Sequence, residues 1–230
     1  MLLKYYQKID DALSYLLSFV CDEKKLLKEI FGKNKINYVD IGTNEGSFLE
    51  YLSKFFLFKK IICFEPIHEL SQKLNKKFKK YKNIEIYNLA LSNKNENKKF
   101  YQYNISSQSS FYKQNNIFKS LKSLKRISRV KTVIFDDKFK SKSKIDFCKI
   151  DVQGEEVNVL KGMKKNLKRK SIKLIKIEIS FIERYQGSKP NFFNIVSFLM
   201  KYNYHLISIS KIKYKNNQIL LMDAYFLLKK

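Results

Sequence analysis

Residues 38–46, of sequence YVDIGTNEG, constrain the fold of this chain more than any other segment. An apolar run that carries an acid, Asp40, ends in a loop with two glycines, Gly42 and Gly46, and an amphipathic run follows. Because the chain has only six glycines, two in one loop are a strong signal. This order predicts a strand, a tight turn that approaches a small molecule, and a helix whose N-terminus faces that molecule. The carboxylate of Asp40 would repel a pyrophosphate and attract a cationic amino or sulfonium group.

The length and composition indicate one α/β domain of 230 residues with a sizeable apolar core. No stretch approaches the roughly 18 consecutive apolar residues of a membrane helix, and residues 13–20 lack the cleavage site of a signal peptide. The three cysteines, Cys21, Cys63 and Cys148, have no zinc-site spacing and fit reduced, buried thiols. We therefore expect a cytoplasmic protein without a transmembrane segment.

The formal net charge of +26 is of the size seen in proteins that bind nucleic acid or an anionic surface. Only four of the 47 basic residues are arginine, however, and phosphate and base recognition favour the planar fork of arginine. Lysine, asparagine, isoleucine, phenylalanine and tyrosine all have A/T-rich codons, so a low-GC bacterial genome explains the bias. The charge therefore does not by itself indicate a nucleic-acid partner, and a contact with an acidic glycan, a phospholipid surface or RNA stays open.

The hydrophobic pattern predicts alternating strands and helices. Residues 1–33 read as an N-terminal helical extension, and residues 93–143 as an insertion that contains strands and a lid. The alternation implies parallel strands joined by right-handed crossovers, with an antiparallel pair at the end. The predicted strands are 36–41, 60–64, 84–91, 145–152, 172–179, 204–210 and 218–228, and the predicted helices are 45–56, 68–81, from 155 onward, and 191–202.

Two polar residues close the early strands. Glu65 lies 19 residues after Gly46, where dinucleotide-type folds place an acid that accepts hydrogen bonds from ribose hydroxyls. Asn88 follows the third strand and would either reach an adenine ring or cap a turn. Since the loop is not Gly-x-Gly-x-x-Gly, a nicotinamide or flavin cofactor is disfavoured.

Residues 145–162 form the second informative stretch, in which a buried strand runs into a polar turn. Lys149 and Asp151 are two residues apart and so point to one face. Ligands of open parallel sheets lie beyond the carboxyl ends of the strands, which places Asp151 at the site unless it merely pairs with Lys149. Glu178 ends the next strand, and with Asp151 it would hold Mg²⁺ or divide the roles of base and orienting group. A salt bridge from Glu178 to a lysine is the alternative.

Together these stretches resemble the FkbM family of S-adenosylmethionine-dependent methyltransferases over residues 36–230. The family commonly has glutamate where this chain has Gln153, while Asp151 and Glu155 stay in register. The resemblance rests on residues 39–46 (VDIGTNEG), 64–66 (FEP), 88–92 (NLALS), 109–110, 130–137, 149–156 (KIDVQGEE) and 159–162 (VLKG).

The resemblance implies a Rossmann-like class I methyltransferase fold. Its sheet has seven mostly parallel strands with the last one antiparallel, and helices cover both faces. S-adenosylmethionine would be the methyl donor, residues 34–92 the donor-binding half, residues 93–143 the insertion that shapes the acceptor pocket, and residues 144–230 the second half of the sheet. The donor-binding residues would be Asp40, Gly42, Thr43, Asn44, Gly46, Glu65, Asn88 and Ala90.

The resemblance also implies methyl transfer to a hydroxyl of a sugar or related small molecule, in the tailoring of bacterial surface polysaccharide or lipopolysaccharide. Asp151 would assist deprotonation, Lys149 or a metal would stabilise the developing alkoxide, and Glu178 would complete the catalytic group. Two rivals stay open. One is an RNA methyltransferase that uses the lysine-rich surface, and the other is a catalytically silent module that binds a nucleoside. The sequence leaves the oligomeric state undetermined.

Overall fold

The computed structural model describes residues 22–115, 124–139, 144–215 and 217–229. Of the predicted N-terminal extension, residues 1–21 lie outside this range, and the helix α2 (Glu23–Phe31) confirms the helical prediction for the rest. The helix begins where Asp22 accepts hydrogen bonds from the backbone N–H groups of Lys24 and Lys25. It ends at Gly32, whose φ of +59° suits a residue without a side chain.

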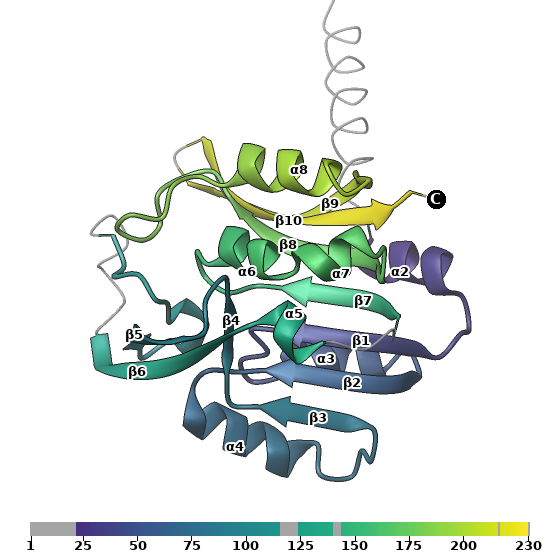
Figure 1. Cartoon of the computed structure of the whole chain (residues 1–230), viewed down its shortest axis with the longest axis horizontal. Coiled ribbons are helices and arrows are strands. Elements are labelled where there is room, and N and C mark those ends of the chain that lie inside the picture. The colour runs from purple at the N-terminus through teal and green to yellow at the C-terminus, as the bar shows by residue number, and fades with distance from the viewer. Residues whose placement is uncertain (1–21, 116–123, 140–143, 216, 230) are drawn as a thin grey trace, which may run out of the picture.

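A seven-stranded sheet in the order β3-β2-β1-β7-β8-β10-β9 forms the centre of the molecule (Figure 1). The strands β3, β2, β1, β7 and β8 are parallel, and β10 is antiparallel to β8 and to β9. The predicted sheet, with its last strand antiparallel, is therefore confirmed. Its strands are β1 (Ile36–Ile41), β2 (Phe58–Phe64), β3 (Ile84–Tyr87), β7 (Ile145–Ile150), β8 (Ile172–Ser180), β9 (Tyr204–Lys215) and β10 (Gln218–Leu228).

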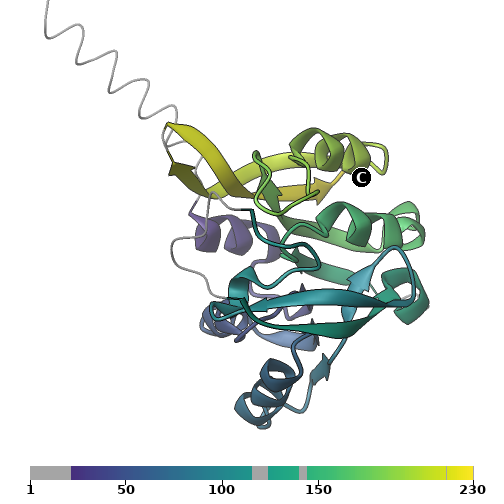
Figure 2. The ribbon, with the colours of Figure 1, turned by 90° about the vertical axis from the view of Figure 1, so that its left-hand side faces the viewer.

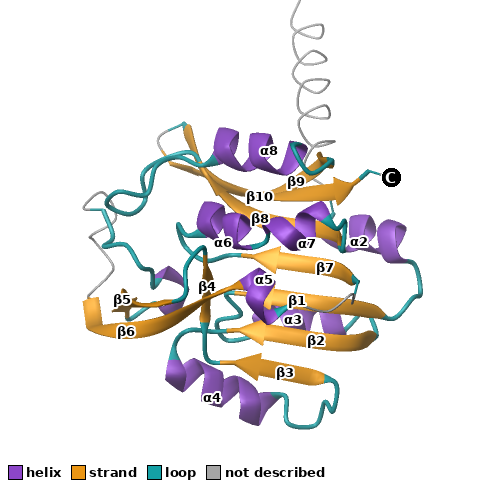
Figure 3. Cartoon of the chain, in the orientation of Figure 1, coloured by secondary structure: helices purple, strands orange, loops and turns teal. Residues whose placement is uncertain are grey.

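Helices cover both faces of this sheet, as Figure 3 shows. In β1, Tyr38 packs on one face with Leu49 of α3, and Val39 packs on the other face in the same cluster as Leu160 of α6. Parallel strands buried on both faces explain the nearly unbroken apolar runs of the sequence. Within the described residues, every helix is too short or too polar to span a bilayer. The remaining helices are α3 (Ser47–Ser53), α4 (His68–Lys77), α5 (Phe135–Lys138), α6 (Glu156–Gly162), α7 (Lys164–Lys168) and α8 (Phe192–Met200).

The predicted third strand, residues 84–91, is wrong as a single element. The chain leaves the central sheet at Asn88, and β4 (Ala90–Ser92) pairs instead with β6 (Leu124–Ile134). With β5 (Glu96–Tyr103), these strands form a second sheet in the order β4-β6-β5. This small sheet lies beyond the carboxyl ends of β1, β2 and β3 (Figures 1 and 2). The insertion therefore does contain strands, and they stand over the edge where a ligand of a parallel sheet would bind.

The edge strand β9 is longer than predicted and carries a bulge. Leu221 of β10 pairs with Lys213, and Asp223 pairs with Ser210, so two residues of β9, Lys211 and Ile212, face one residue of β10. The sequence showed only the alternating run 204–210, because the bulge shifts the alternation by one residue.

Candidate functional site

Two cavities open at the carboxyl ends of β1, β2 and β7. The first lies between the strand ends and the small sheet and is mostly apolar, and it measures about 610 Å³ when space open to solvent is included. The second lies between the end of β7 and the helices α2 and α3, where charged side chains line it, and it measures about 1150 Å³ on the same basis. Gly42, Asn44 and Asp151 line both cavities. The first cavity also has Glu65, Ile67, Leu89, Leu91, Phe100 and Phe111, and the second Glu23, Phe48, Tyr51, Lys149, Lys176 and Lys211.

The protein's own backbone leaves no room for a side chain at Gly42, and two side chains pack closely against Gly46. A Cβ atom on Gly42, whose φ is +82°, would lie 1.9 Å from the carbonyl oxygen of Asp151. A Cβ atom on Gly46, whose φ is +79°, would lie 2.8 Å from carbon atoms of Leu74 and Phe78 in and after α4. We attributed the glycines to the close approach of a small molecule, and the structure shows that they first let β7 and α4 approach the loop.

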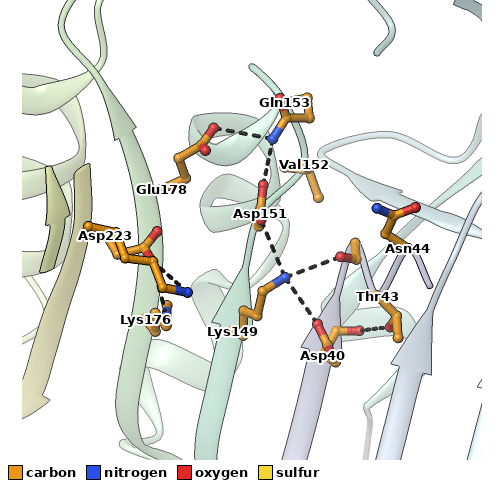
Figure 4. Close-up of polar contacts among 12 residues, drawn as sticks. Asp40, Thr43, Asn44, Lys149, Asp151, Val152, Gln153, Lys176, Glu178 and Asp223 are labelled. Carbon is orange, nitrogen blue, oxygen red and sulfur yellow. Dashed lines mark hydrogen bonds and ion pairs between the residues drawn. The ribbon is translucent and has the colours of Figure 1, made fainter. Parts of the chain in front are cut away.

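Lys149 lies between Asp40 and Asp151 (Figure 4). Its Nζ is 3.3 Å from Asp40 Oδ1, 3.2 Å from the carbonyl oxygen of Gly42 and 3.5 Å from Asp151 Oδ2. Burial alone would lower the pKa of Lys149, but the two carboxylates raise it above its usual value, so Lys149 is a cation. Asp40 is fully buried and lines neither cavity. The charge of Asp40 is therefore balanced by Lys149, and the ammonium group of Lys149 stands between Asp40 and a ligand in the second cavity.

Glu65 is held in place by backbone N–H groups. Its Oε2 accepts a hydrogen bond from the N–H of Asn44 at 2.7 Å, and its Oε1 accepts one from Ile67 at 2.8 Å. Each carboxylate oxygen keeps a further lone pair that can accept a hydroxyl hydrogen. Burial raises the pKa of Glu65 to about 7, although the two backbone hydrogen bonds oppose that rise. Ser106, which follows β5 in the insertion, donates to Asn44 Oδ1 at 2.7 Å and so links the insertion to the glycine loop.

Gln153 joins the two predicted carboxylates. Its Nε2 donates to Asp151 Oδ1 at 2.6 Å and to Glu178 Oε2 at 3.3 Å (Figure 4). Its Oε1 accepts from Arg184 Nη2 at 2.9 Å and from the hydroxyl of Tyr185 at 2.7 Å. Because two donors bind the amide oxygen, the amide nitrogen must face the carboxylates. The neighbouring strands β7 and β8 thus bring Asp151 and Glu178 close, as expected, with an amide group between them.

Sequence reasoning missed Arg184 and Tyr185. The guanidinium Nη1 of Arg184 lies 2.6 Å from Glu178 Oε2. The predicted alternative, a salt bridge from Glu178, is therefore observed, with an arginine in place of a lysine. Arg184 is one of only four arginines in a chain with 47 basic residues, and that rarity was the available signal.

A family model described as the methyltransferase FkbM domain matches residues 40–206. The chain belongs to the FkbM methyltransferase family. The match begins at Asp40 and contains the glycine loop, Glu65 and the Asp151–Gln153 turn. None of the curated proteins compared with the chain matches it.

Solved structures with the same fold include other methyltransferases. One is the FkbM methyltransferase of Methylobacillus flagellatus KT, which superposes with a TM-score of 0.54 at 13% sequence identity. The alignment covers 95% of this chain but only 59% of that one. The methyltransferase domain of bacterial CtHen1-C has a TM-score of 0.54 at 13% identity, over 90% of this chain and 95% of that one. The N-methyltransferase NodS of Bradyrhizobium japonicum WM9 has a TM-score of 0.51 at 9% identity, over 90% and 93%. The Rossmann-like class I methyltransferase fold is confirmed.

The residues of this FkbM chain fit a nucleoside in the first cavity. Glu65 offers free acceptor positions beside apolar walls from both sheets, and Ala90 lines the same cavity. Asn88 lies outside it, with Nδ2 donating to the carbonyl oxygens of Glu65 and Pro66 at 3.0 Å each. Asn88 therefore caps the turn that carries Glu65. Thr43 lines the second cavity and donates to the carbonyl oxygen of Asp40.

The predicted magnesium site has no support in this FkbM chain. Among the described residues, no three His, Cys, Asp or Glu side chains are placed to hold a metal ion. Asp151 already contacts Lys149 and Gln153, and Glu178 already pairs with Arg184. Mg²⁺ prefers carboxylates and waters in near-octahedral geometry, and this donor set does not fit it.

Proposed function

We propose that this chain is an S-adenosylmethionine-dependent O-methyltransferase of the cytoplasm that methylates a hydroxyl of a sugar or related small molecule. The proposed role is the tailoring of a bacterial surface polysaccharide or lipopolysaccharide. Membership of the FkbM family supports the methyl donor. One observation carries the rest: an apolar cavity with a ribose-type acid meets a polar cavity at a single carboxylate, Asp151. The free, buried thiols of Cys63 and Cys148 fit a reducing compartment.

The donor supplies a methyl group on a positively charged sulfur. A hydroxyl in the second cavity attacks this carbon, so that the O–C bond forms as the C–S bond breaks and the sulfur becomes neutral. This placement departs from the expectation that the insertion shapes the acceptor pocket, because the described residues of the insertion line only the first of these two cavities. The hydroxyl proton passes to Asp151, and the ammonium of Lys149, 3.5 Å from Asp151 Oδ2, stabilises negative charge on the oxygen. Most of the acceleration would come from placing the two reactants in contact. Glu178 acts through Gln153 as a positioning residue.

Asp151 is ionised at neutral pH in this arrangement. Burial alone would raise its pKa, but Lys149, the hydrogen bond from Gln153 and Arg184 together lower it below the usual value. Burial and the nearby charge of Asp151 raise the pKa of Glu178 to about 8, which Arg184 opposes. The surroundings thus shift the pKa values of the two carboxylates in opposite directions. Asp151, which lines both cavities, is the carboxylate placed to accept a proton, whereas Glu178 lines neither.

Donor binding should depend on pH through Glu65. Since the pKa of Glu65 is about 7, lowering the pH from 8 to 6 protonates it and removes an acceptor for the ribose hydroxyls. We expect the affinity for S-adenosylhomocysteine, measured by calorimetry, to fall across this range. In Glu65→Gln we expect affinity about tenfold lower at pH 8 and little pH dependence. Glu85→Gln, outside both cavities, is the control. Unchanged affinity and pH dependence in Glu65→Gln would refute the ribose role.

Replacing Gln153 by glutamate should change the pH dependence of turnover. Gln153→Glu removes the Nε2 donor and sets a third carboxylate beside Asp151 and Glu178, and like charges raise carboxyl pKa values. We expect the acid limb of the pH–rate profile to move to higher pH by about one unit. A profile that keeps its wild-type midpoint, in a variant with wild-type thermal stability, would show that Gln153 does not hold Asp151.

Labelled methyl transfer tests the proposed function. The enzyme would be given S-adenosylmethionine with a radioactive methyl group, together with neutral and acidic sugar precursors and, separately, RNA, each with and without Mg²⁺. We expect alkali-stable label in a sugar, and no dependence on Mg²⁺. Label in RNA alone would identify the rival RNA methyltransferase. Bound S-adenosylhomocysteine without any methylated product would identify the silent nucleoside-binding module.

A further inference from the structure

The bulge in β9 turns Lys211 toward the second cavity. Lys211 and Ile212 together face a single residue of β10, and Lys211 has a φ of +51°, a region that residues with a side chain rarely adopt. Ile212 packs against the large core cluster, whereas Lys211 lines the second cavity. Bulges of this kind commonly re-aim a side chain beside a functional site. The bulge thus holds Lys211 in an unfavourable backbone conformation that places its ammonium group in this cavity.

Lys211 differs from the other two lysines of the cavity. Lys176 has a side chain that is 3% exposed, lies 3.1 Å from Asp223 Oδ2 and bonds to Glu23. Lys149 contacts Asp40, Gly42 and Asp151. The Nζ of Lys211 is 3.7 Å from Asp223 Oδ2 and 3.9 Å from Glu23 Oε2, both beyond hydrogen-bond distance, and its side chain is 57% exposed. Within the described part of the chain its ammonium group therefore makes no hydrogen bond, and its contacts are these two longer ion pairs and a cation–π contact with Phe48, 5.4 Å from the ring centroid.

The carboxylates near Lys211 are already supplied with donors. Glu23 accepts from Lys176 and from the hydroxyl of Tyr225, and Asp223 pairs with Lys176. With Lys211 and Lys176, these two carboxylates form a cluster of balanced charge. A ligand that accepts from Lys211 and donates hydroxyl hydrogens to Asp223 or Glu23 would complement it. The overall charge of +26 favours the approach of an anion.

Lys211 lies on the acceptor side of the cavity. Its ammonium group is beside Asp223 of β10, and β8 separates β10 from β7 in the sheet. The ammonium group of Lys211 is therefore about 10 Å, or two strand spacings, from β7, the strand that ends just before Asp151. The rings of Phe48 and Tyr51 line the space between α3 and the sheet and offer flat apolar surfaces.

On the proposed methyltransferase function, we infer that the acceptor is an acidic sugar and that Lys211 binds its carboxylate or phosphate. The sugar hydroxyls would then donate to Asp223 or Glu23, and one hydroxyl would reach Asp151. Lys211 is thus assigned as a specificity-determining residue of the acceptor site.

Matched sugars test this inference. Binding of D-glucuronate, D-glucose 6-phosphate and D-glucose would be measured by ligand-observed NMR, with S-adenosylhomocysteine present. We expect wild-type protein to bind at least one acidic sugar about tenfold or more tightly than glucose, and Lys211→Gln to lose that preference. Lys211→Arg should retain part of it. Lys213→Gln, an exposed lysine of the same strand outside the cavity, should behave as wild type.

Three results with the sugars would overturn the inference: no preference in the wild type, the same preference in Lys211→Gln, or an equal loss in Lys213→Gln. Binding of S-adenosylhomocysteine, the product of the methyl donor, is measured as well, so that failure of this inference can be told apart from failure of the proposed function. Lys211→Gln should bind S-adenosylhomocysteine as the wild type does. Weaker binding of S-adenosylhomocysteine with unchanged binding of methylthioadenosine would assign Lys211 to the donor's own carboxylate and overturn the inference. Failure of wild-type protein to bind S-adenosylhomocysteine would instead refute the proposed function.

Discussion

Asp151→Asn is expected to reduce methyl transfer at least about 100-fold while leaving donor binding nearly unchanged. Asparagine has the shape of aspartate and can still accept the hydrogen bond that Gln153 Nε2 donates at 2.6 Å. It cannot take the hydroxyl proton, and it removes the negative charge that lies 3.5 Å from Lys149 Nζ. Lys149 keeps Asp40 as its partner, so the fold should tolerate the change.

The measurement compares turnover of labelled methyl donor with calorimetric binding of S-adenosylhomocysteine. Asp146→Asn is the matched control, because Asp146 lies at the opposite end of β7 and accepts a hydrogen bond from the N–H of Asn37. We expect Asp146→Asn to retain turnover. Wild-type turnover in Asp151→Asn would end the proposal that Asp151 accepts the proton, and loss of donor affinity would assign it to donor binding.

Gly42→Ala is expected to destabilise the protein by more than about 4 kcal/mol, which lowers the melting temperature by roughly 8–16 °C for a chain of this size. A Cβ atom at position 42 would lie 1.9 Å from the carbonyl oxygen of Asp151 and 2.9 Å from its carbonyl carbon. Both are backbone atoms and cannot rotate away. The loop and the end of β7 would have to separate. That separation would disturb the hydrogen bond that the N–H of Asp151 donates to the carbonyl oxygen of Ile41 at 3.0 Å.

Gly187→Ala isolates the steric part of this effect. Gly187 has a φ of +83°, nearly that of Gly42, but a Cβ atom there would meet nothing within 4 Å. Both substitutions carry the backbone cost of a left-handed alanine, about 1–2 kcal/mol. Thermal unfolding followed by circular dichroism should show a much larger loss for Gly42→Ala. Equal losses of stability would mean that the close approach of β7 to the glycine loop is not the reason why position 42 requires glycine.

Local patterns predicted the central sheet well, because buried parallel strands are short apolar runs and their ends carry polar residues. The strand at 36–41, the acid Glu65 and the turn after β7 were all found in this way. The break at Asn88 was missed, since a run of apolar residues continues through β4 and only pairing with β6, some 40 residues later, draws it into another sheet. The bulge at Lys211 was missed for a similar reason, because a one-residue shift hides the alternation.

The sequence by itself determined the order of strands and helices, the glycine loop and the acids at the strand ends, since each depends on neighbouring residues. Only the tertiary structure decided which charges meet. Lys149 lies between Asp40, 109 residues away, and Asp151, and Gln153 is oriented by Arg184 and Tyr185. It also showed that Gly42 is required by the backbone of β7. Such contacts join segments far apart in the chain, and their geometry follows from packing, which no local pattern encodes.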